Sequence, residues 1–145
     1  MTLLTGDQSD EAEFVLTEDV AKRNTEVIAR PGQRRFKFRA LQRYGPCCAV
    51  CDVKITELLD AAHILPKSRK GTDDPRNSLV LCALHHRAFD SRLFGIEPDT
   101  LAIVFLPNGP TAGALVISRT TLQHLERKPH TKALTSAWET WQRKR

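Results

Sequence analysis

Residues 59–90, LDAAHILPKSRKGTDDPRNSLVLCALHHRAFD, hold the side chains on which the fold and the chemistry of this chain depend. Four of them stand out by their order. His63 ends a short apolar run, Asn77 follows fourteen residues later, His86 follows nine after that, and Asp90 four after that. Each alone is typical of an ordinary core, turn or helix-end position, but together their order and spacing favour a catalytic site.

The end of this stretch suits cation binding. In a helix over residues 83–92, His86 and Asp90 stand four positions apart and share one face, so both can hold one cation. His85 then points in a different direction and is available for another metal.

Two pairs of potential zinc ligands frame the stretch. Cys48 and Cys51 form a CxxC pair, and Cys82 and His85 form a second pair at the same spacing. Such pairs predict a tetrahedral Cys3His site for a structural zinc ion, which adds stability where large apolar residues are few. Cys47 is the spare cysteine, predicted to be a partly buried free thiol. A register in which Cys47 replaces Cys48 stays open.

The charge of the chain is uneven. Its 145 residues carry a net charge of +5, and residues 30–92 hold thirteen Lys/Arg against six Asp/Glu. This basic excess around the candidate site favours a polyanionic partner such as nucleic acid. Because the sequence shows neither a membrane-spanning run nor a signal peptide, we expect a cytoplasmic protein without a membrane partner. In that compartment four cysteines indicate metal or thiol chemistry rather than disulfides.

The remaining segments predict small elements around this centre, in an α+β arrangement that fits a single domain over residues 1–145. Leu134, Trp138 and Trp141 form an apolar stripe that packs the last helix onto the domain, with a dimer contact as the alternative for the tryptophans. The expected elements are an acidic mobile arm (1–13), two helices (18–29 and 33–43), a C-terminal β-hairpin (LAIVF, 101–105, and ALVIS, 114–118) and a terminal helix (131–145).

The ordered motif AAHI…N…LCxxHHxAFD resembles the HNH endonucleases, whose core has the ββα-metal fold. The form flanked by zinc-binding cysteines is found among bacterial restriction-type HNH proteins. The flanks GQRRFKFRALQRYGPCCAVC and FDSRLFGIEPD are similar to that subgroup as well. The resemblance implies an HNH and zinc core over residues 32–100, followed by the hairpin and helix over 101–145.

The resemblance also implies a role for each residue of the motif. His63 matches the general base that takes a proton from the attacking water, and Asn77 matches the residue that fixes the loop and orients the catalytic group. His86 matches a ligand of the catalytic cation, and Asp90 falls where some relatives carry another ligand. The implied activity is hydrolysis of DNA phosphodiester bonds with one divalent cation, Mg²⁺ or Mn²⁺ with Ni²⁺ as a further option, leaving 5′-phosphate ends.

One position departs from the family pattern. Many members carry an Asp or His ligand directly before the first histidine, where this chain has Ala62. Asp60 is nearby, but residues 60 and 63 of an extended strand point to opposite faces. Two arrangements stay open: a bulge that brings Asp60 to the cation, or a site made of His86, Asp90 and water.

The expected partner is DNA, in a restriction, mobile-element or phage setting. A homodimer would supply two active sites for double-strand cutting, and a DNA-reader domain would belong to another subunit or to a larger protein. The alternative function is a non-catalytic, zinc-stabilised nucleic-acid-binding module on an HNH scaffold, and a zinc-dependent redox or interaction protein is a third. The residues expected to contact DNA phosphates are Lys67, Arg69, Lys70, Arg76, Arg87 and Arg92.

Overall fold

The computed structural model describes residues 31–69 and 71–144, which belong to one compact unit. The expected acidic arm (1–13), the expected helix over 18–29 and Lys70 lie outside the described residues.

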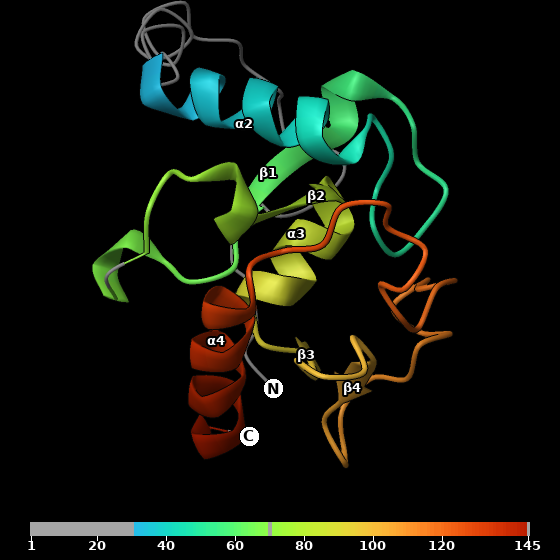
Figure 1. Cartoon of the computed structure of the whole chain (residues 1–145). Coiled ribbons are helices and arrows are strands. Elements are labelled where there is room, and N and C mark those ends of the chain that lie inside the picture. The colour runs from blue at the N-terminus through green and yellow to red at the C-terminus, as the bar shows by residue number, and fades with distance from the viewer. Residues whose placement is uncertain (1–30, 70, 145) are drawn as a thin grey trace, which may run out of the picture. The chain divides into compact units, whose positions relative to one another are not determined.

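The described residues form three α-helices and two small antiparallel sheets, so the expected α+β class is confirmed (Figure 1). The helices are α2 (Pro31–Tyr44), α3 (Ala83–Asp90) and α4 (Thr131–Lys144). The first sheet pairs β1 (Leu59–His63) with β2 (Ser78–Cys82), and the second pairs β3 (Phe94–Ile96) with β4 (Ile103–Phe105). Single 3-10 turns cover Thr56–Leu58, Lys67–Arg69 and Pro75–Asn77.

The hairpin of β1 and β2 lies at the centre, and α3 begins directly after β2. The two strands pair in continuous register, from His63 opposite Ser78 to Leu59 opposite Cys82, so β1 contains no bulge. Both α2 and α3 contact both strands. All five residues of β2 are buried, as expected for a strand with both faces covered. The order β1–β2–α3 gives the ββα arrangement that the motif predicts.

α2 covers the hairpin with one apolar face. Phe36 and Ala40, four positions apart, are buried, while Lys37 between them is half-buried and Arg39 is exposed. The helix ends at Tyr44 because Gly45 adopts a positive φ of 89° and Pro46 cannot continue it. The predicted helix over 33–43 is therefore confirmed.

The predicted hairpin of residues 101–105 and 114–118 is wrong. Part of the first segment forms β4, but its partner is β3, which precedes it in the chain. The second segment forms no strand.

The pattern of the second segment explains the error. Leu115 and Ile117 are buried and Val116 is 63% exposed, which mimics the alternation of a strand. Val116, however, has a positive φ of 57°, and the amide of Ile117 donates to the carbonyl of Ala112. The alternation of buried and exposed residues therefore belongs to a turn that covers the cysteine-rich region. This turn does not pair with a strand of the described residues.

α4 packs its apolar stripe against β3, and the predicted terminal helix is confirmed. Leu134 and Trp141 are buried, and the partly exposed Trp138 stacks on Trp141 with ring centroids 5.3 Å apart. β3 accommodates this ring because it carries Gly95, where a Cβ would lie only 2.6 Å from Trp141.

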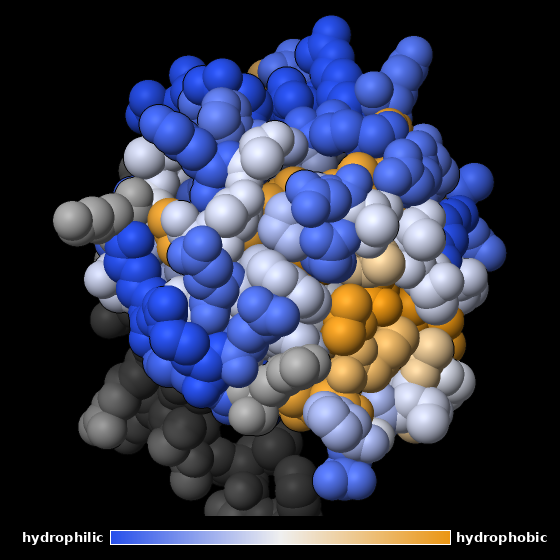
Figure 2. All heavy atoms as spheres, turned by 60° about the horizontal axis from the view of Figure 1, so that its bottom comes forward, coloured by the Kyte–Doolittle hydropathy of each residue, from blue (hydrophilic) through white to orange (hydrophobic). Residues whose placement is uncertain are grey.

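The surface is largely polar. Figure 2 shows hydrophilic residues over most of the face that it presents and one hydrophobic area on the β3–β4 side. Among the described residues, no helix is both long and apolar enough to cross a membrane.

Candidate active site and metal centre

The four predicted zinc ligands lie together in the fold. Their ligand atoms all lie within 4.8 Å of one another, and all four side chains are buried. Cys48 and Cys51 come from the loop before β1, Cys82 ends β2, and His85 lies in the first turn of α3. The cluster thus joins the loop, the hairpin and the helix at one end of the ββα unit.

The distances suit a tetrahedral zinc site. Zinc–ligand distances imply about 3.8 Å between two sulfurs and about 3.5 Å between a sulfur and a nitrogen. The two sulfurs of Cys51 and Cys82 lie 3.9 Å apart, and the Nδ1 atom of His85 lies 3.5 Å from the sulfur of Cys48. The other ring nitrogen of His85 donates to the carbonyl of Leu115 at 2.7 Å, which leaves Nδ1 as the ligand atom.

Zinc binding would change the protonation of the thiols. Burial raises the pKa of Cys48 and raises the pKa of Cys51 to about 12. Without a cation, these cysteines are neutral thiols that make weak contacts, and a bound metal would displace their protons.

Cys47 lies outside this cluster. It is half-buried, and its sulfur contacts the backbone carbonyls of Cys48 and Cys51 at 3.5 and 3.7 Å. The cluster therefore contains Cys48, and the alternative in which Cys47 takes its place is not found.

His63, at the end of β1, is fixed on two sides. Its ring stacks on Phe36 of α2, with centroids 4.1 Å apart and planes at 11°. Its Nε2 atom lies 2.9 Å from a carboxylate oxygen of Asp73, whose other oxygen pairs with Lys67 at 2.8 Å. These contacts, first with Lys67 and then with His63, hold the pKa of Asp73 below its usual range, so Asp73 is a carboxylate at neutral pH.

Asn77 closes the loop between the two strands. Its side-chain oxygen accepts from the amide of Leu65 at 2.9 Å, and its side-chain nitrogen donates to the carbonyls of Leu65 and Thr72 at 3.0 and 2.9 Å. The residue is buried. Its amide is thus committed to the backbone of the loop that carries Asp73.

His86 lies between two carboxylates. Its Nδ1 atom is 2.9 Å from Asp60 on β1, and its Nε2 atom is 3.2 Å from Asp90, one turn along α3. Asp60 therefore reaches the α3 side of the hairpin without a bulge, while His63 stacks on α2 at the other side, as expected for strand residues on opposite faces. Ala62 is completely buried.

One cation cannot contact both nitrogens of an imidazole ring. Asp60 and Asp90 approach different nitrogens of His86, so one of them can share a cation with His86 while the other orients the ring. In the structure both carboxylates contact the ring directly, at 2.9 and 3.2 Å, so a cation bound at one nitrogen would take the place of one of these contacts.

The basic residues near the motif differ in their environment. Arg76 is paired with Asp74, which also caps the turn that Arg76 belongs to and has a pKa lowered to about 2 by these contacts. Arg69 and Arg92 line a cavity between the loop and α4. Arg87 is exposed on α3. Paired cations are less available for phosphate than exposed ones, so Arg87, Arg69 and Arg92 are the stronger candidates.

Two neighbours of His63 were not predicted as site residues. Asp73 lies in the loop, where its neighbour Asp74 and four basic residues give it no distinguishing spacing, and only the fold brings it to His63. Phe36 lies in the segment predicted to be a helix over 33–43, and its stack on His63 is a tertiary contact between distant segments.

Comparison with known proteins agrees with this geometry. The family model described as HNH endonuclease matches residues 48–97. This range holds the Cys3His cluster, His63 with Asp73, and His86 with its two carboxylates. No curated protein matches the chain significantly. Residues 48–97 are an HNH endonuclease family domain, which implies a nuclease-type function.

Proposed function

We propose that the chain is a metal-dependent endonuclease that hydrolyses DNA phosphodiester bonds. The observation that carries this proposal is the pairing of His63 with Asp73 and of His86 with two carboxylates, on two sides of one hairpin within a segment that matches the HNH endonucleases. A base and a cation site are the two components that phosphodiester hydrolysis requires near neutral pH.

His63 is the proposed general base. Its Nε2–H donates to the carboxylate of Asp73, which leaves the lone pair of Nδ1 to accept a proton. When a water molecule attacks phosphorus, its proton passes to Nδ1, its oxygen becomes part of the 5′-phosphate, and the 3′ oxygen leaves and is protonated by solvent. Asp73 then stabilises the imidazolium form of His63. Stacking on Phe36 keeps the ring in one orientation.

His86 and Asp90 are the proposed ligands of the catalytic cation, Mg²⁺ or Mn²⁺ with Ni²⁺ as an option. Asp90 has the more exposed side chain, 63% against 45% for Asp60, and is therefore more accessible to a substrate phosphate. Asp60 is then the carboxylate that orients His86 through Nδ1. A divalent cation bound there would stabilise charge on the phosphate and on the leaving oxygen.

The Cys3His cluster is the proposed site of a structural zinc ion. It has four protein ligands and is buried, which is the arrangement of closed structural sites. Its ligand His85 directly precedes His86, so the zinc would fix the start of α3 and with it the position of the catalytic histidine.

The substrate and setting follow from the resemblance. Arg69, Arg87 and Arg92 are proposed to contact DNA phosphates, which position the duplex without reading its sequence. On the resemblance alone we also propose a restriction or mobile-element role, a homodimer for double-strand cutting and a separate DNA-reader domain.

The test is plasmid cleavage by the purified protein, with its zinc content measured, in the presence of Mg²⁺, Mn²⁺ or Ni²⁺ and in their absence. Nicked or linear plasmid that forms only with an added cation is the expected result. If the zinc-loaded protein binds the plasmid but never cuts it with any of these cations, the alternative of a non-catalytic binding module replaces the nuclease. The buried Ala62, in place of the usual ligand, is the observation that favours that alternative.

A further inference from the structure

A cavity beside the candidate active site is not used by the proposed chemistry. It lies between the loop after β1, the turn after α3, and α4. Its apolar wall includes Leu65, Phe89 and Trp138. The cavity measures about 90 Å³, whereas one water molecule needs roughly 10–15 Å³ of such space. It therefore has room for several water molecules, and a flat ring would enter it in part, with its remainder outside the open side.

Two residues that line the cavity are sequence neighbours of the two parts of the proposed active site. Ile64, which lines it, directly follows His63, and Phe89 directly precedes Asp90. A ligand in the cavity would contact the segments that carry the proposed base and the proposed cation ligand.

Four cations gather around this cavity. Arg69 and Arg92 line it, and Arg143 lines the adjoining groove with Arg69. The pKa of Lys144 is lowered, first by loss of hydration and then by the positive charges of Arg69, Arg92 and Arg143. Like charges held together in this way favour an anion.

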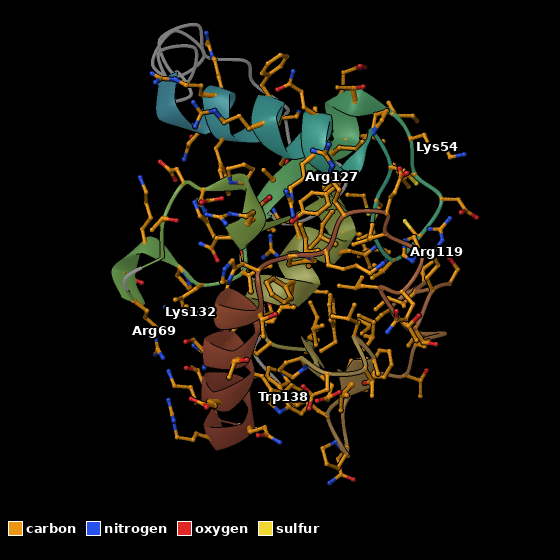
Figure 3. All side chains as sticks on the ribbon, viewed as in Figure 1. Lys54, Arg69, Arg119, Arg127, Lys132 and Trp138 are labelled. Carbon is orange, nitrogen blue, oxygen red and sulfur yellow. The ribbon has the colours of Figure 1, made fainter. Side chains whose placement is uncertain are left out.

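Acidic residues do little to balance these cations. Among the residues that the structure describes, no Asp or Glu lines the cavity, and Glu139 is the acidic residue in the lining of the adjoining groove. Figure 3 shows Arg69 beside α4 and Trp138 on that helix, whereas Lys54 and Arg119 lie at the other side of the view. The cationic group is thus local to the cavity and α4.

We propose that this cavity binds the base of an unpaired nucleotide in the DNA, stacked on Trp138, while Arg69, Arg92, Arg143 and Lys144 contact the neighbouring phosphates. An aromatic wall within an apolar cavity suits the flat face of a base, and surrounding guanidinium groups suit its phosphates. The inference rests on the proposed function, because it takes DNA as the substrate, and it adds a preference for DNA with an unpaired base.

Binding is measured with the zinc-loaded full chain carrying His63→Ala, without an added divalent cation, so that cleavage does not interfere. Three labelled duplexes are compared: one fully paired, one with a single extra unpaired base, and one with an abasic residue at that place. The two tryptophans of the chain both line the cavity, so their fluorescence reports directly on its occupation.

The expected result is tighter binding of the duplex with the unpaired base, with quenched tryptophan fluorescence. Trp138→Ala lowers the affinity for that duplex by roughly 5- to 100-fold, the usual effect of losing one base stack. Trp138→Phe retains most of the affinity because it keeps an aromatic face. The matched control Lys54→Gln, an exposed cation away from the cavity, leaves the preference unchanged.

Equal affinity for the three duplexes, or a preference that survives Trp138→Ala, would overturn the inference. The proposed function is tested separately by plasmid cleavage with the wild type. Cleavage without a preference for the unpaired base contradicts this inference alone, whereas base-dependent binding without cleavage under any cation contradicts the nuclease alone.

Discussion

Asp73 sets which nitrogen of His63 would accept a proton in the proposed catalysis. Because its carboxylate accepts from Nε2 at 2.9 Å, the proton of the neutral ring stays on Nε2 and the lone pair on Nδ1. Lys67 holds the other carboxylate oxygen, so Asp73 itself has little freedom to turn. A base oriented in this way needs less reorganisation when it takes the proton.

Asp73→Asn is expected to lower kcat by about 10- to 1000-fold with little change in KM, since an amide no longer fixes the tautomer or stabilises the charged ring. Steady-state cleavage of a labelled duplex gives both constants. Asp99→Asn, which removes an exposed carboxylate from the turn between β3 and β4, is the control and should cleave like the wild type. An equal loss in both variants would contradict a specific role for Asp73.

The roles of the two carboxylates at His86 can be distinguished by substituting each of them in turn. Asp90→Asn should raise the Mg²⁺ concentration needed for half-maximal cleavage by more than 100-fold, because it removes a proposed ligand. Asp60→Asn should raise it by about 10- to 100-fold, the usual effect of losing a carboxylate that orients a ligand. A larger effect of Asp60→Asn would exchange the two roles. The readout is the cleavage rate as a function of Mg²⁺ concentration.

Asp74 predicts a pH dependence of stability. Its pKa is lowered from an ordinary value of 3.8 to about 2 in the folded chain, through contacts with Arg76. A lowered folded-state pKa adds stability above the unfolded value, and this stability is lost as the pH falls from about 4 towards about 2. Asp74→Asn should therefore reduce the urea midpoint near pH 6 but not near pH 2. A constant difference at both pH values would contradict this.

At the scale of the elements, the Cys3His cluster ties the loop before β1 to the end of β2 and the start of α3. A zinc ion bound there would add to the stability that the buried Val50, Leu59 and Leu81 already give these segments. Cys51→Ser should lose the zinc and lower the melting temperature. The adjacent Cys47→Ser, outside the cluster, should keep one zinc per chain. Metal analysis and thermal unfolding check both variants, and equal zinc contents would contradict the ligand set.

Elements with a strong local pattern were predictable from the sequence. α2 and α4 follow from apolar residues at helical spacing and from Gly45-Pro46 as a helix end, and the paired ligand spacing brought Cys48, Cys51, Cys82 and His85 together. The helix signals are local in the sequence, and the metal-cluster signal comes from the short spacing within each ligand pair.

Contacts made only by the tertiary structure were not predictable. Leu115 and Ile117 alternate with polar or exposed positions as in a strand, but their burial comes from covering the cysteine cluster. In the same way, Asp73 reaches His63 only because Asn77 folds the loop back on itself. The alternation around Leu115 and Ile117 is thus a misleading periodic signal, and the contact of Asp73 with His63 leaves no such signal.

At the scale of the described unit, the two chemical sites are placed by one hairpin. Leu59 and Cys82 mark the end of the hairpin at the cysteine cluster, and His63 and Ser78 mark the other end. The proposed structural zinc therefore lies at one end of β1 and the proposed base at the other, while α3 carries His86 along the hairpin between them. The hairpin and α3 would thus set the relative position of the proposed base and the proposed cation.

The proposed role of His63 as the base of a metal-dependent nuclease is tested by the single-turnover cleavage rate of His63→Ala with and without added imidazole. The expected rate is about 10²- to 10⁴-fold below that of the wild type, with partial recovery when imidazole is added and unchanged DNA binding and zinc content. A His63→Ala variant that cleaves as fast as the wild type would contradict this role.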